Sequence, residues 1–541
     1  MRKVFTLSTC VLFVSLFPFL FSCQKEVKPL TIPTADQVGA KAMPEEIAPL
    51  GKLPFEMPEP QRPVFPELTV SIADKGAVEG EPITPIVNQT IDEVSAQGGG
   101  MVIVPAGKWK SSRIELKSNV NLHIAEGAEI EFSEKVEDYL PAVFTRHEGI
   151  EVMSAGAFIY ANEQENIAVT GKGTLWGPPM ETPIRKLPNG PSVVEKDVDY
   201  NAPIEERVFD GMDGRYFYRP KSIAPIRCQN VLIEGITINR SLLWNIAPTY
   251  CENVIIRGVT VNSVEVPSGD GIDIESCKNV LVEYSTLNNG DDCFTLKSGR
   301  AEDGIRVNIP TENVVIRYSL AQNGHGGITC GSETAGNIKN VYVHDCVFDG
   351  TRAALRFKTR RNRGGGSEKI FFERLRMINI NDVFAWDLLG TPYYMGELAE
   401  RTPARAIDKL TPTVRDIHAK DLIVESAKRF VKATCIPEIP LSGVLIENVD
   451  ANCEKFITHM DDVDGFTVRN STIRLQNDTM NVLDGRNIAF EQVNLLTPSG
   501  TVVVNVEGEK STNITFENQG KKTAYQGTTP LTVMVQKEGV E

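Results

Sequence analysis

After residue 23 the sequence has no run of about 18 consecutive apolar residues, so no later segment is expected to span a membrane. Histidine and tryptophan are scarce, and the ten cysteines show neither the CxxC nor the Cys/His spacing of a zinc site. Basic residues are also in deficit: 56 Lys and Arg face 71 Asp and Glu, a net charge of −15. This balance argues against nucleic acid as a partner, although a local group of cations could still bind a polyanion.

Residues 1–22 have the composition of an export signal, with Arg2 and Lys3 before an apolar stretch. The stretch ends at Leu20-Phe21-Ser22-Cys23, which resembles a bacterial lipobox and would make Cys23 the lipidated first residue of the mature chain. Ordinary signal cleavage and an uncleaved anchor are the alternatives. We therefore expect an exported, outer membrane-anchored lipoprotein, periplasmic or on the cell surface, that meets the membrane only through this lipid anchor.

Residues 23–65 are rich in Pro, Glu and Lys without periodicity, which predicts a tether or linker. Residues 66–541 carry an internal repeat and are predicted to form one catalytic domain. The repeat is an Asn-Val-x-Ile-like phrase with spacings of 23, 26, 34 and 27 residues. Its clearest copies begin at Asn230, Asn253, Asn279, Asn313 and Asn340, and looser copies begin at Asn119 and Asn166.

Each copy reads as a short strand followed by a turn, and no helix-period stretch lies between copies. Repeats of this kind predict an all-β parallel solenoid, in which stacked asparagines hydrogen-bond as a ladder. Cys228, Cys251 and Cys277 each stand two residues before a repeat asparagine, and buried thiol stacking is the preferred interpretation, with a disulfide as the alternative. The segment Thr90–Gln97 is predicted as a short helical N-terminal cap, and residues 180–218 and 391–412 as long loops beside a groove.

Three carboxylates recur at coil spacing, because Asp270 precedes the pair Asp291 and Asp292 by 21 residues. Inverting glycoside hydrolysis needs a protonated carboxyl and a carboxylate roughly 6.5 to 9.5 Å apart, and neighbouring coils can supply both. Crowding should raise the pKa of one of them, which would then serve as the acid. Consecutive strand residues point to opposite faces, so we expect a turn or bulge after Gly290 to bring both members of the pair into one cleft.

The sequence resembles glycoside hydrolase family 28, the polygalacturonase family, and is most similar to its bacterial exo-acting members. The resemblance rests on four motifs in the family's order, Ser268-Gly269-Asp270, Gly290-Asp291-Asp292, Gly324-His325-Gly326 and Arg356-Phe357-Lys358. It implies a single-stranded right-handed parallel β-helix that cleaves α-1,4-galacturonosyl linkages with inversion. It implies neither a metal nor another cofactor.

The same resemblance implies a role for each motif residue. Asp291 would be the general acid, Asp270 and Asp292 would activate water, and His325 would support the protonation state of the acid. Arg356 and Lys358 would bind a galacturonate carboxylate. Lys297, in a segment similar to exo-acting members, is a further candidate for binding substrate.

The residues themselves agree on the substrate, since six cations lie within 12 residues of an otherwise acidic chain, namely Arg352, Arg356, Lys358, Arg360, Arg361 and Arg363. The expected partner is therefore a pectic polysaccharide or its oligogalacturonides, bound by a monomer. Ser268-Gly269 replaces the Asn-Thr of the family motif, so a rhamnogalacturonan or substituted galacturonan stays open as substrate. The rival interpretations are a β-helix polysaccharide lyase and a non-catalytic glycan-binding solenoid.

Overall fold

The computed structural model describes residues 31–187, 194, 197–518 and 520–537. The predicted signal peptide of residues 1–22 and the predicted lipid anchor at Cys23 lie outside the described residues. Residues 32–541 form one compact unit. Among the described residues, no helix is both long and apolar enough to cross a membrane.

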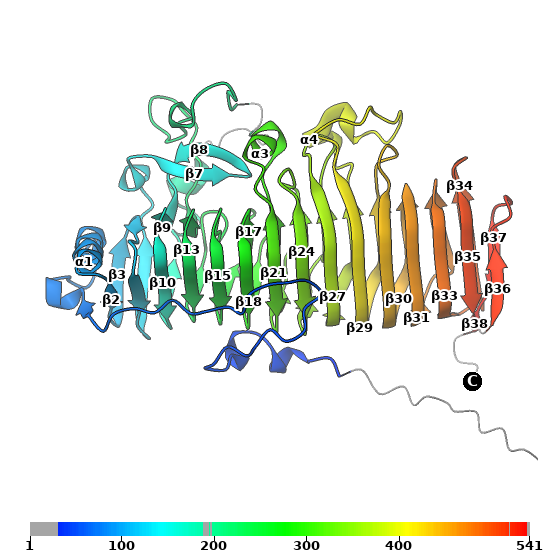
Figure 1. Ribbon diagram of the computed structural model, residues 1–541, viewed down its shortest axis with the longest axis horizontal. Helices are drawn as coiled ribbons and strands as arrows, with labels where there is room; N and C mark the ends of the chain where they lie inside the picture. The colour runs from blue at the N-terminus through cyan, green and yellow to red at the C-terminus, as the bar shows by residue number, and fades with distance from the viewer. Residues whose placement is uncertain (1–30, 188–193, 195–196, 519, 538–541) are drawn as a thin grey trace, which may run out of the picture. The chain divides into compact units, whose positions relative to one another are not determined.

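The unit is a parallel β-helix, which confirms the predicted all-β solenoid (Figure 1). Its coils stack three strand faces, here called A, B and C. Face A carries the repeat phrases and consists of β1 (Thr69–Ser71), β2 (Gly100–Val104), β5 (Val120–Ile124), β10 (Glu165–Gly171), β13 (Gln229–Glu234), β15 (Glu252–Arg257), β18 (Lys278–Glu283), β21 (Thr311–Arg317), β24 (Ile338–His344), β27 (Gly366–Ile378), β29 (Thr413–Thr434), β30 (Leu441–Asp461), β31 (Val463–Leu475), β33 (Arg486–Thr497) and β35 (Thr512–Asn518).

Face B follows face A in each coil, until the long strands from β27 onward run through both. Its strands are β3 (Gly107–Ser111), β6 (Ala128–Phe132), β11 (Thr174–Trp176), β14 (Thr237–Asn239), β16 (Thr260–Ser263), β19 (Thr286–Asn289), β22 (Leu320–Gln322) and β25 (Val347–Asp349). Face C consists of β4 (Ile114–Glu115), β9 (Ala157–Asn162), β12 (Lys221–Ile226), β17 (Ile272–Glu275), β20 (Phe294–Lys297), β23 (Gly326–Gly331), β26 (Ala353–Lys358), β28 (Ile380–Asp387), β32 (Thr479–Leu483), β34 (Thr501–Glu507) and β37 (Leu531–Met534).

The remaining elements flank this stack. They are the hairpin strands β7 (Val143–His147) and β8 (Ile150–Ser154), the terminal strands β36 (Lys521–Ala524) and β38 (Gln536–Lys537), the helices α1 (Thr84–Ala96), α2 (Pro183–Lys186), α3 (Ala301–Val307) and α4 (Pro392–Met395), and the 3₁₀ turns η1 (Ala35–Gln37), η2 (Ala40–Ala42), η3 (Ala73–Lys75), η4 (Val136–Tyr139), η6 (Ile204–Glu206) and η7 (Gly396–Ala399).

The asparagine ladder predicted from the repeat is present on face A. Each ladder amide donates to the side-chain oxygen of the asparagine one coil earlier, at 3.0 to 3.3 Å. All seven asparagines, from Asn119 to Asn340, have φ between 51° and 64°. Asparagine tolerates this left-handed conformation better than most residues, so the same side chain both permits the turn and links the coils.

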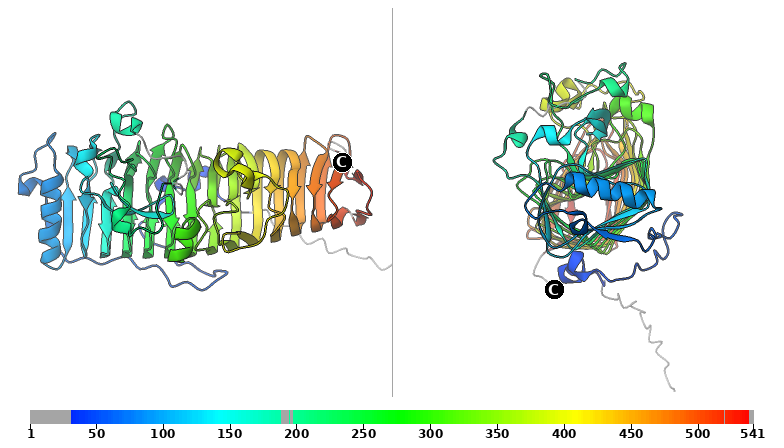
Figure 2. Two further views of the ribbon diagram at one scale, coloured as in Figure 1. Left: turned by 90° about the horizontal axis from the view of Figure 1, so that it is seen from above. Right: turned by 90° about the vertical axis from the view of Figure 1, so that its left-hand side faces the viewer.

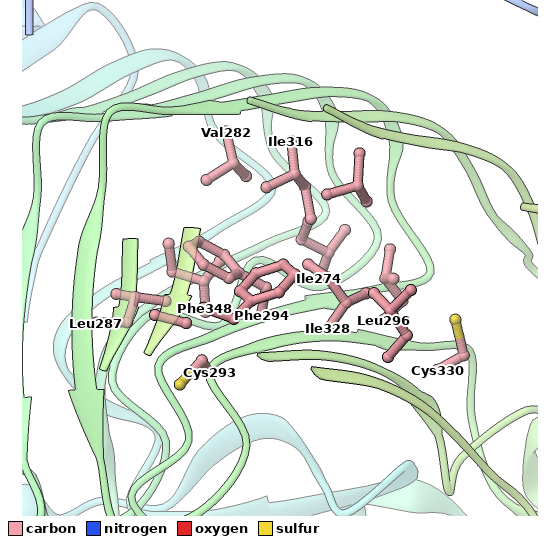
Figure 3. Close-up of a cluster of buried hydrophobic side chains, with 14 of the residues drawn as sticks. Ile274, Val282, Leu287, Cys293, Phe294, Leu296, Ile316, Ile328, Cys330 and Phe348 are labelled. Atoms are coloured by element: carbon pink, nitrogen blue, oxygen red, sulfur yellow. The ribbon is translucent and has the colours of Figure 1, made fainter. Parts of the chain in front are cut away.

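The core is a continuous apolar column inside the coils, because alternate residues of every strand point inward. Figure 3 shows part of it, with Phe294 stacked among Ile274, Ile328 and Phe348. All eight cysteines within the described residues are free and buried, including the column Cys228, Cys251 and Cys277. This agrees with the preferred interpretation as buried thiols.

The N-terminal cap is α1, which lies across the end of the coil stack (Figure 2, right). Val87, Ile91 and Val94 face the open core and are fully buried. The helix begins at Thr84, earlier than the predicted Thr90, because Pro85 is well suited to its first turn. The helix therefore closes the sheet edge that would otherwise expose unpaired backbone groups.

Residues 32–65 do not hang free as a linker would, and we call them the N-terminal strap. Ile47 and Leu50 pack on the outer surface of face A, on Leu281 among others. Strap carbonyls accept hydrogen bonds from Arg257, Arg317 and Arg376. This docking could not be predicted from the sequence, because the apolar residues of the strap have no period.

Insertions rise above face C on both sides of its centre (Figure 1). On the N-terminal side stand the β7–β8 hairpin and α3; on the C-terminal side stand α4 and η7. The predicted loop 180–218 contains α2 and η6, and its residues 188–193 and 195–196 lie outside the described residues. The hairpin was not predicted, since its strands pair with each other and, through Met153, with Val208, but not with the repeat strands of the coils.

Candidate active site

The three predicted carboxylates come together at the centre of face C. Asp270 lies two residues before β17, and Asp291 and Asp292 lie in the turn before its neighbour β20. One side-chain oxygen of each lies within 4.8 Å of the others. A Cβ at Gly290 would stand 2.2 Å from the Val266 carbonyl oxygen, so only glycine lets the turn pack here. The expected turn therefore brings both members of the pair to one side.

Facing oxygens of the three carboxylates lie within 4.8 Å of one another, a shorter distance than the roughly 6.5 to 9.5 Å between the carboxyl groups of typical inverting enzymes. Coil stacking explains the short distance, since neighbouring strands lie only about 4.8 Å apart. In this site the separation alone therefore does not fix the stereochemistry.

Asp292 is held by the two cations of the fourth motif. Its oxygens accept hydrogen bonds from Arg356 at 2.9 Å and from Lys358 at 3.0 Å, and its side chain is fully buried. Burial raises the pKa of Asp292, but the charges of Lys358 and Arg356 outweigh it and hold the pKa well below its usual value. Asp292 is therefore an ionised carboxylate.

Asp270 has the opposite environment. Burial, and next the charge of Asp273 and that of Asp291, raise the pKa of Asp270 well above its usual value. Lys297 opposes this rise without cancelling it. Crowding predicts a raised pKa for one of the three carboxyls, and in the structure that carboxyl is Asp270, whereas the family resemblance implies Asp291 as the acid.

Asp291 and His325 form the accessible part of the cluster. His325 Nδ1 lies 3.0 Å from Asp291 Oδ1, and their side chains are 46% and 26% exposed. The backbone N–H of His325 also donates to the Asp291 carbonyl, at 3.0 Å. A group that protonates a leaving oxygen must be reachable by substrate, and of the three carboxylates Asp291 meets this condition best.

Arg356 and Lys358 are alternate residues of β26, so both side chains leave the same side of face C. They remain partly exposed, at 19% and 18%. Their partly exposed guanidinium and ammonium groups can donate hydrogen bonds to an incoming carboxylate. The cluster is thus organised to receive an anionic group.

Lys297 lies beneath the cluster and is buried, with 4% of its side chain exposed. Its ammonium group contacts Glu333 at 3.0 Å, Asp273 at 3.6 Å and Asp270 at 3.8 Å. Neither Glu333 nor Asp273 was predicted as a site residue, although Asp273 stands in register with Thr295 on the strand pair that carries Lys297. In this structure the Lys297 side chain contacts these buried carboxylates and lies beneath the surface that a substrate would contact.

The β7–β8 hairpin is fixed beside the cluster by buried ion pairs. Asp303 of α3 accepts hydrogen bonds from the Glu151 backbone N–H and from Arg207, both at 2.9 Å. The Arg300 backbone N–H donates to the Gly149 carbonyl at the hairpin tip, at 3.1 Å. A wall therefore stands on the N-terminal side of the carboxylates.

Comparison with known proteins agrees with this site. The family model of glycosyl hydrolases family 28 matches residues 216–455, a span that includes all seven predicted site residues. A probable polygalacturonase from Vitis vinifera is 26% identical over 399 residues, covering 70% of this chain and 74% of the relative. An exo-poly-alpha-D-galacturonosidase from Dickeya chrysanthemi is 25% identical over 55% of this chain and 52% of its own length.

Among solved structures, a hyperthermoactive exopolygalacturonase from Thermotoga maritima is similar with a TM-score of 0.63 and 29% identity, over 88% of this chain and 97% of that one. A family 28 exopolygalacturonase from Yersinia enterocolitica shares the fold, with a TM-score of 0.62 and 22% identity over 79% and 78%. Fold, motif order and family model agree. The resemblance noted in the sequence is confirmed: residues 216–455 match the model of glycosyl hydrolases family 28, and the chain is a glycoside hydrolase.

Proposed function

We propose that this enzyme is a polygalacturonase that hydrolyses α-1,4-galacturonosyl linkages of pectin, acting from a chain end and inverting the anomeric carbon. The observation that carries the proposal is the contact between Asp292 and the pair Arg356 and Lys358, which sets an anion-binding pair directly beside the reacting carboxylates. Relatives named as polygalacturonases support the substrate class.

In this mechanism Asp291 protonates the leaving oxygen, and His325 hydrogen-bonds to it. Asp292 activates the attacking water, and Asp270 helps to orient that water. A galacturonate carboxylate that binds Arg356 and Lys358 draws these cations from Asp292. Loss of those contacts raises the basicity of Asp292 when substrate is in place.

Inversion and chain-end attack are separate parts of the proposal. The resemblance to family 28 supports inversion, and the short distance between the carboxylate oxygens, which coil stacking explains, does not decide the stereochemistry. We infer chain-end attack from the anchored hairpin, because a wall on the N-terminal side of Asp270 would stop a polymer from extending past the carboxylates. The names of the Dickeya and Thermotoga proteins support the same direction.

A time course on defined oligogalacturonides, with products identified by mass and anomeric configuration, tests all three parts. Galacturonate monomer from the first minutes and a β-configured product are expected. Asp291→Asn should lower kcat about 10²- to 10⁴-fold, the usual contribution of a general acid. Asp450→Asn, at an exposed site on face B, is the matched control and should leave kcat unchanged.

Equal activity of Asp291→Asn and the parent enzyme would refute the assigned acid. An unsaturated product formed only with calcium would indicate a lyase. Rhamnogalacturonan and substituted galacturonan belong in the same assay, since faster cleavage of either would replace unsubstituted galacturonan as the substrate.

We also propose that the chain is exported and attached to the outer membrane as a monomer through a lipid on Cys23, with residues 23–31 as the remaining tether. The lipobox-like ending supports this part. Incorporation of labelled palmitate by the parent chain, and its loss in Cys23→Ser, is the expected result. Equal labelling of both would exclude this anchor.

A further inference from the structure

Lys297 is a buried cation that contacts several acidic side chains at once. Beyond Glu333, Asp273 and Asp270, its ammonium group lies 4.6 Å from the centre of the Trp244 ring. The ring covers the ammonium group and excludes water, which strengthens each of these charge interactions. Because Lys297 extends from β20 and Asp273 from the adjacent β17, the contact is fixed by strand register.

Asp273 is the least satisfied partner of this lysine. Its side chain is fully buried, and neither carboxylate oxygen receives a hydrogen bond from the residues that the structure describes. Burial raises the pKa of Asp273 to about 7, although Lys297 and Lys221 act to lower it. Asp273 and Asp270 both lie close to the Lys297 ammonium group. Near neutral pH their carboxyls therefore compete for its single positive charge.

Other charged groups face these carboxyls from several elements. They are Asp291 and Asp292 before β20, Glu275 on β17, Lys221 on β12, Arg146 on β7, Glu333 and Arg300 beside α3, and Arg363 and Lys358 behind Glu333. Glu275 is paired with Arg146 and lies near Lys221. Glu333 is likewise shared with Arg300, at 2.6 Å. Lys297 is the cation placed between Asp270 and Asp273.

We propose that Lys297 is a positioning residue that holds the Asp270 carboxyl against Asp273 and determines whether Asp270 carries a proton during turnover. Glu333 and Trp244 fix the ammonium group in this place. The inference rests on the proposed function and deepens it, because it assigns control of one reacting carboxyl to residues that never touch the substrate. Lys297 thus moves from the expected substrate-binding role to a role beneath the site.

The test compares the pH dependence of kcat on oligogalacturonides for Lys297→Met and Asp273→Asn. Without the lysine charge, Asp270 ionises less readily, so the profile should move to higher pH by about one unit or more. Without the Asp273 charge, Asp270 ionises more readily, so the profile should move to lower pH. Lys297→Met should lower kcat at neutral pH at least about tenfold and change KM little, whereas Lys297→Arg should keep the parent profile.

Glu283→Gln is the matched control, since it removes the partner of the buried Arg257 and Arg317 on face A. It should lower the melting temperature without moving the pH profile. Unshifted profiles in both test variants, or a rise in KM alone for Lys297→Met, would overturn the inference. The second result would return Lys297 to substrate binding.

A readout without substrate separates this inference from the proposed function. A carboxyl with a raised pKa binds more protons folded than unfolded, so stability falls as the pH rises from its unfolded to its folded pKa. For Asp273 this window runs from about 4 to about 7. Asp273→Asn should flatten the pH dependence of the melting temperature within this window. Lys297→Met should extend that pH dependence to higher pH. If the parent cleaves no galacturonide but these shifts occur, only the proposed function fails; if it cleaves them and the shifts are absent, only the inference fails.

Discussion

Each asparagine of the ladder contributes to the fold in two ways. Its backbone adopts a left-handed conformation, and its side-chain amide hydrogen-bonds to the neighbouring coils. Alanine would lose both, whereas glycine would lose only the hydrogen bonds. The two contributions can therefore be measured at one position.

For Asn279 we expect Asn279→Ala to destabilise the protein by about 2 to 4 kcal/mol, the sum of left-handed strain and lost amide contacts. Asn279→Gly should cost less, because glycine adopts this φ without strain. Denaturant unfolding monitored by circular dichroism measures both. Equal costs would mean that the hydrogen bonds alone matter.

At the residue scale, the sequence was sufficient to predict that the three candidate carboxylates lie together. Asp270, Asp291 and Asp292 could be brought together because one coil separates them, and spacing along the chain translates directly into distance. Lys297 could not be placed so well. Its surroundings include Glu333 and Trp244, which come from other coils, and nothing in the local sequence shows that they close over it.

The β7–β8 hairpin is the element on which the proposed chain-end attack depends. It projects from a coil before the catalytic strands and is held to α3 through Asp303. Asp303→Ala removes both hydrogen bonds and leaves Arg207 buried without its charged partner. The wall should therefore loosen while the three carboxylates stay in place.

With Asp303→Ala we expect oligomers of intermediate length to appear beside the monomer, detectable by mass spectrometry of early products from long oligogalacturonides. Catalysis on a disaccharide should change less than threefold or so, since a short substrate does not meet the wall. A monomer-only product pattern identical to that of the parent would show that the hairpin does not select chain ends.

The strap depends on a few apolar anchors. Leu50 is buried against Leu281 and Val315, which would otherwise lie on the outer surface of face A. Leu50→Ala should destabilise the protein by about 2 to 3 kcal/mol, at the low end of core truncations because the strap can adjust. Val64→Ala, at a position that is 85% exposed, is the control in thermal unfolding and should have no effect.

Strands were the most predictable elements, because the phrase around each repeat asparagine marks their start. The strap and the hairpin were not predictable for a common reason. Both are stabilised by contacts to coils far away in sequence, such as Pro44 and Pro49 with Arg257 and Arg317 or Glu151 with Asp303, and such contacts leave no period in the chain.

At the scale of the whole molecule, stability is a sum over neighbouring coils, since each coil contacts mainly the coils before and after it. Opening can therefore begin in one region while others stay closed. The eight free cysteines within the described residues lie in several coils between Cys228 and Cys453. Their thiols react with an alkylating reagent only after local opening, because burial also raises the pKa of most of them.

We expect negligible alkylation of these cysteines in the native protein and, in moderate denaturant, an order of labelling that follows the coils. Peptide mass spectrometry at timed intervals gives that order. Simultaneous labelling of Cys228 and Cys453 at every denaturant concentration would instead show all-or-none unfolding. The buried thiols are thus native chemical probes, distributed along the coils, that report the order in which the regions of a solenoid unfold.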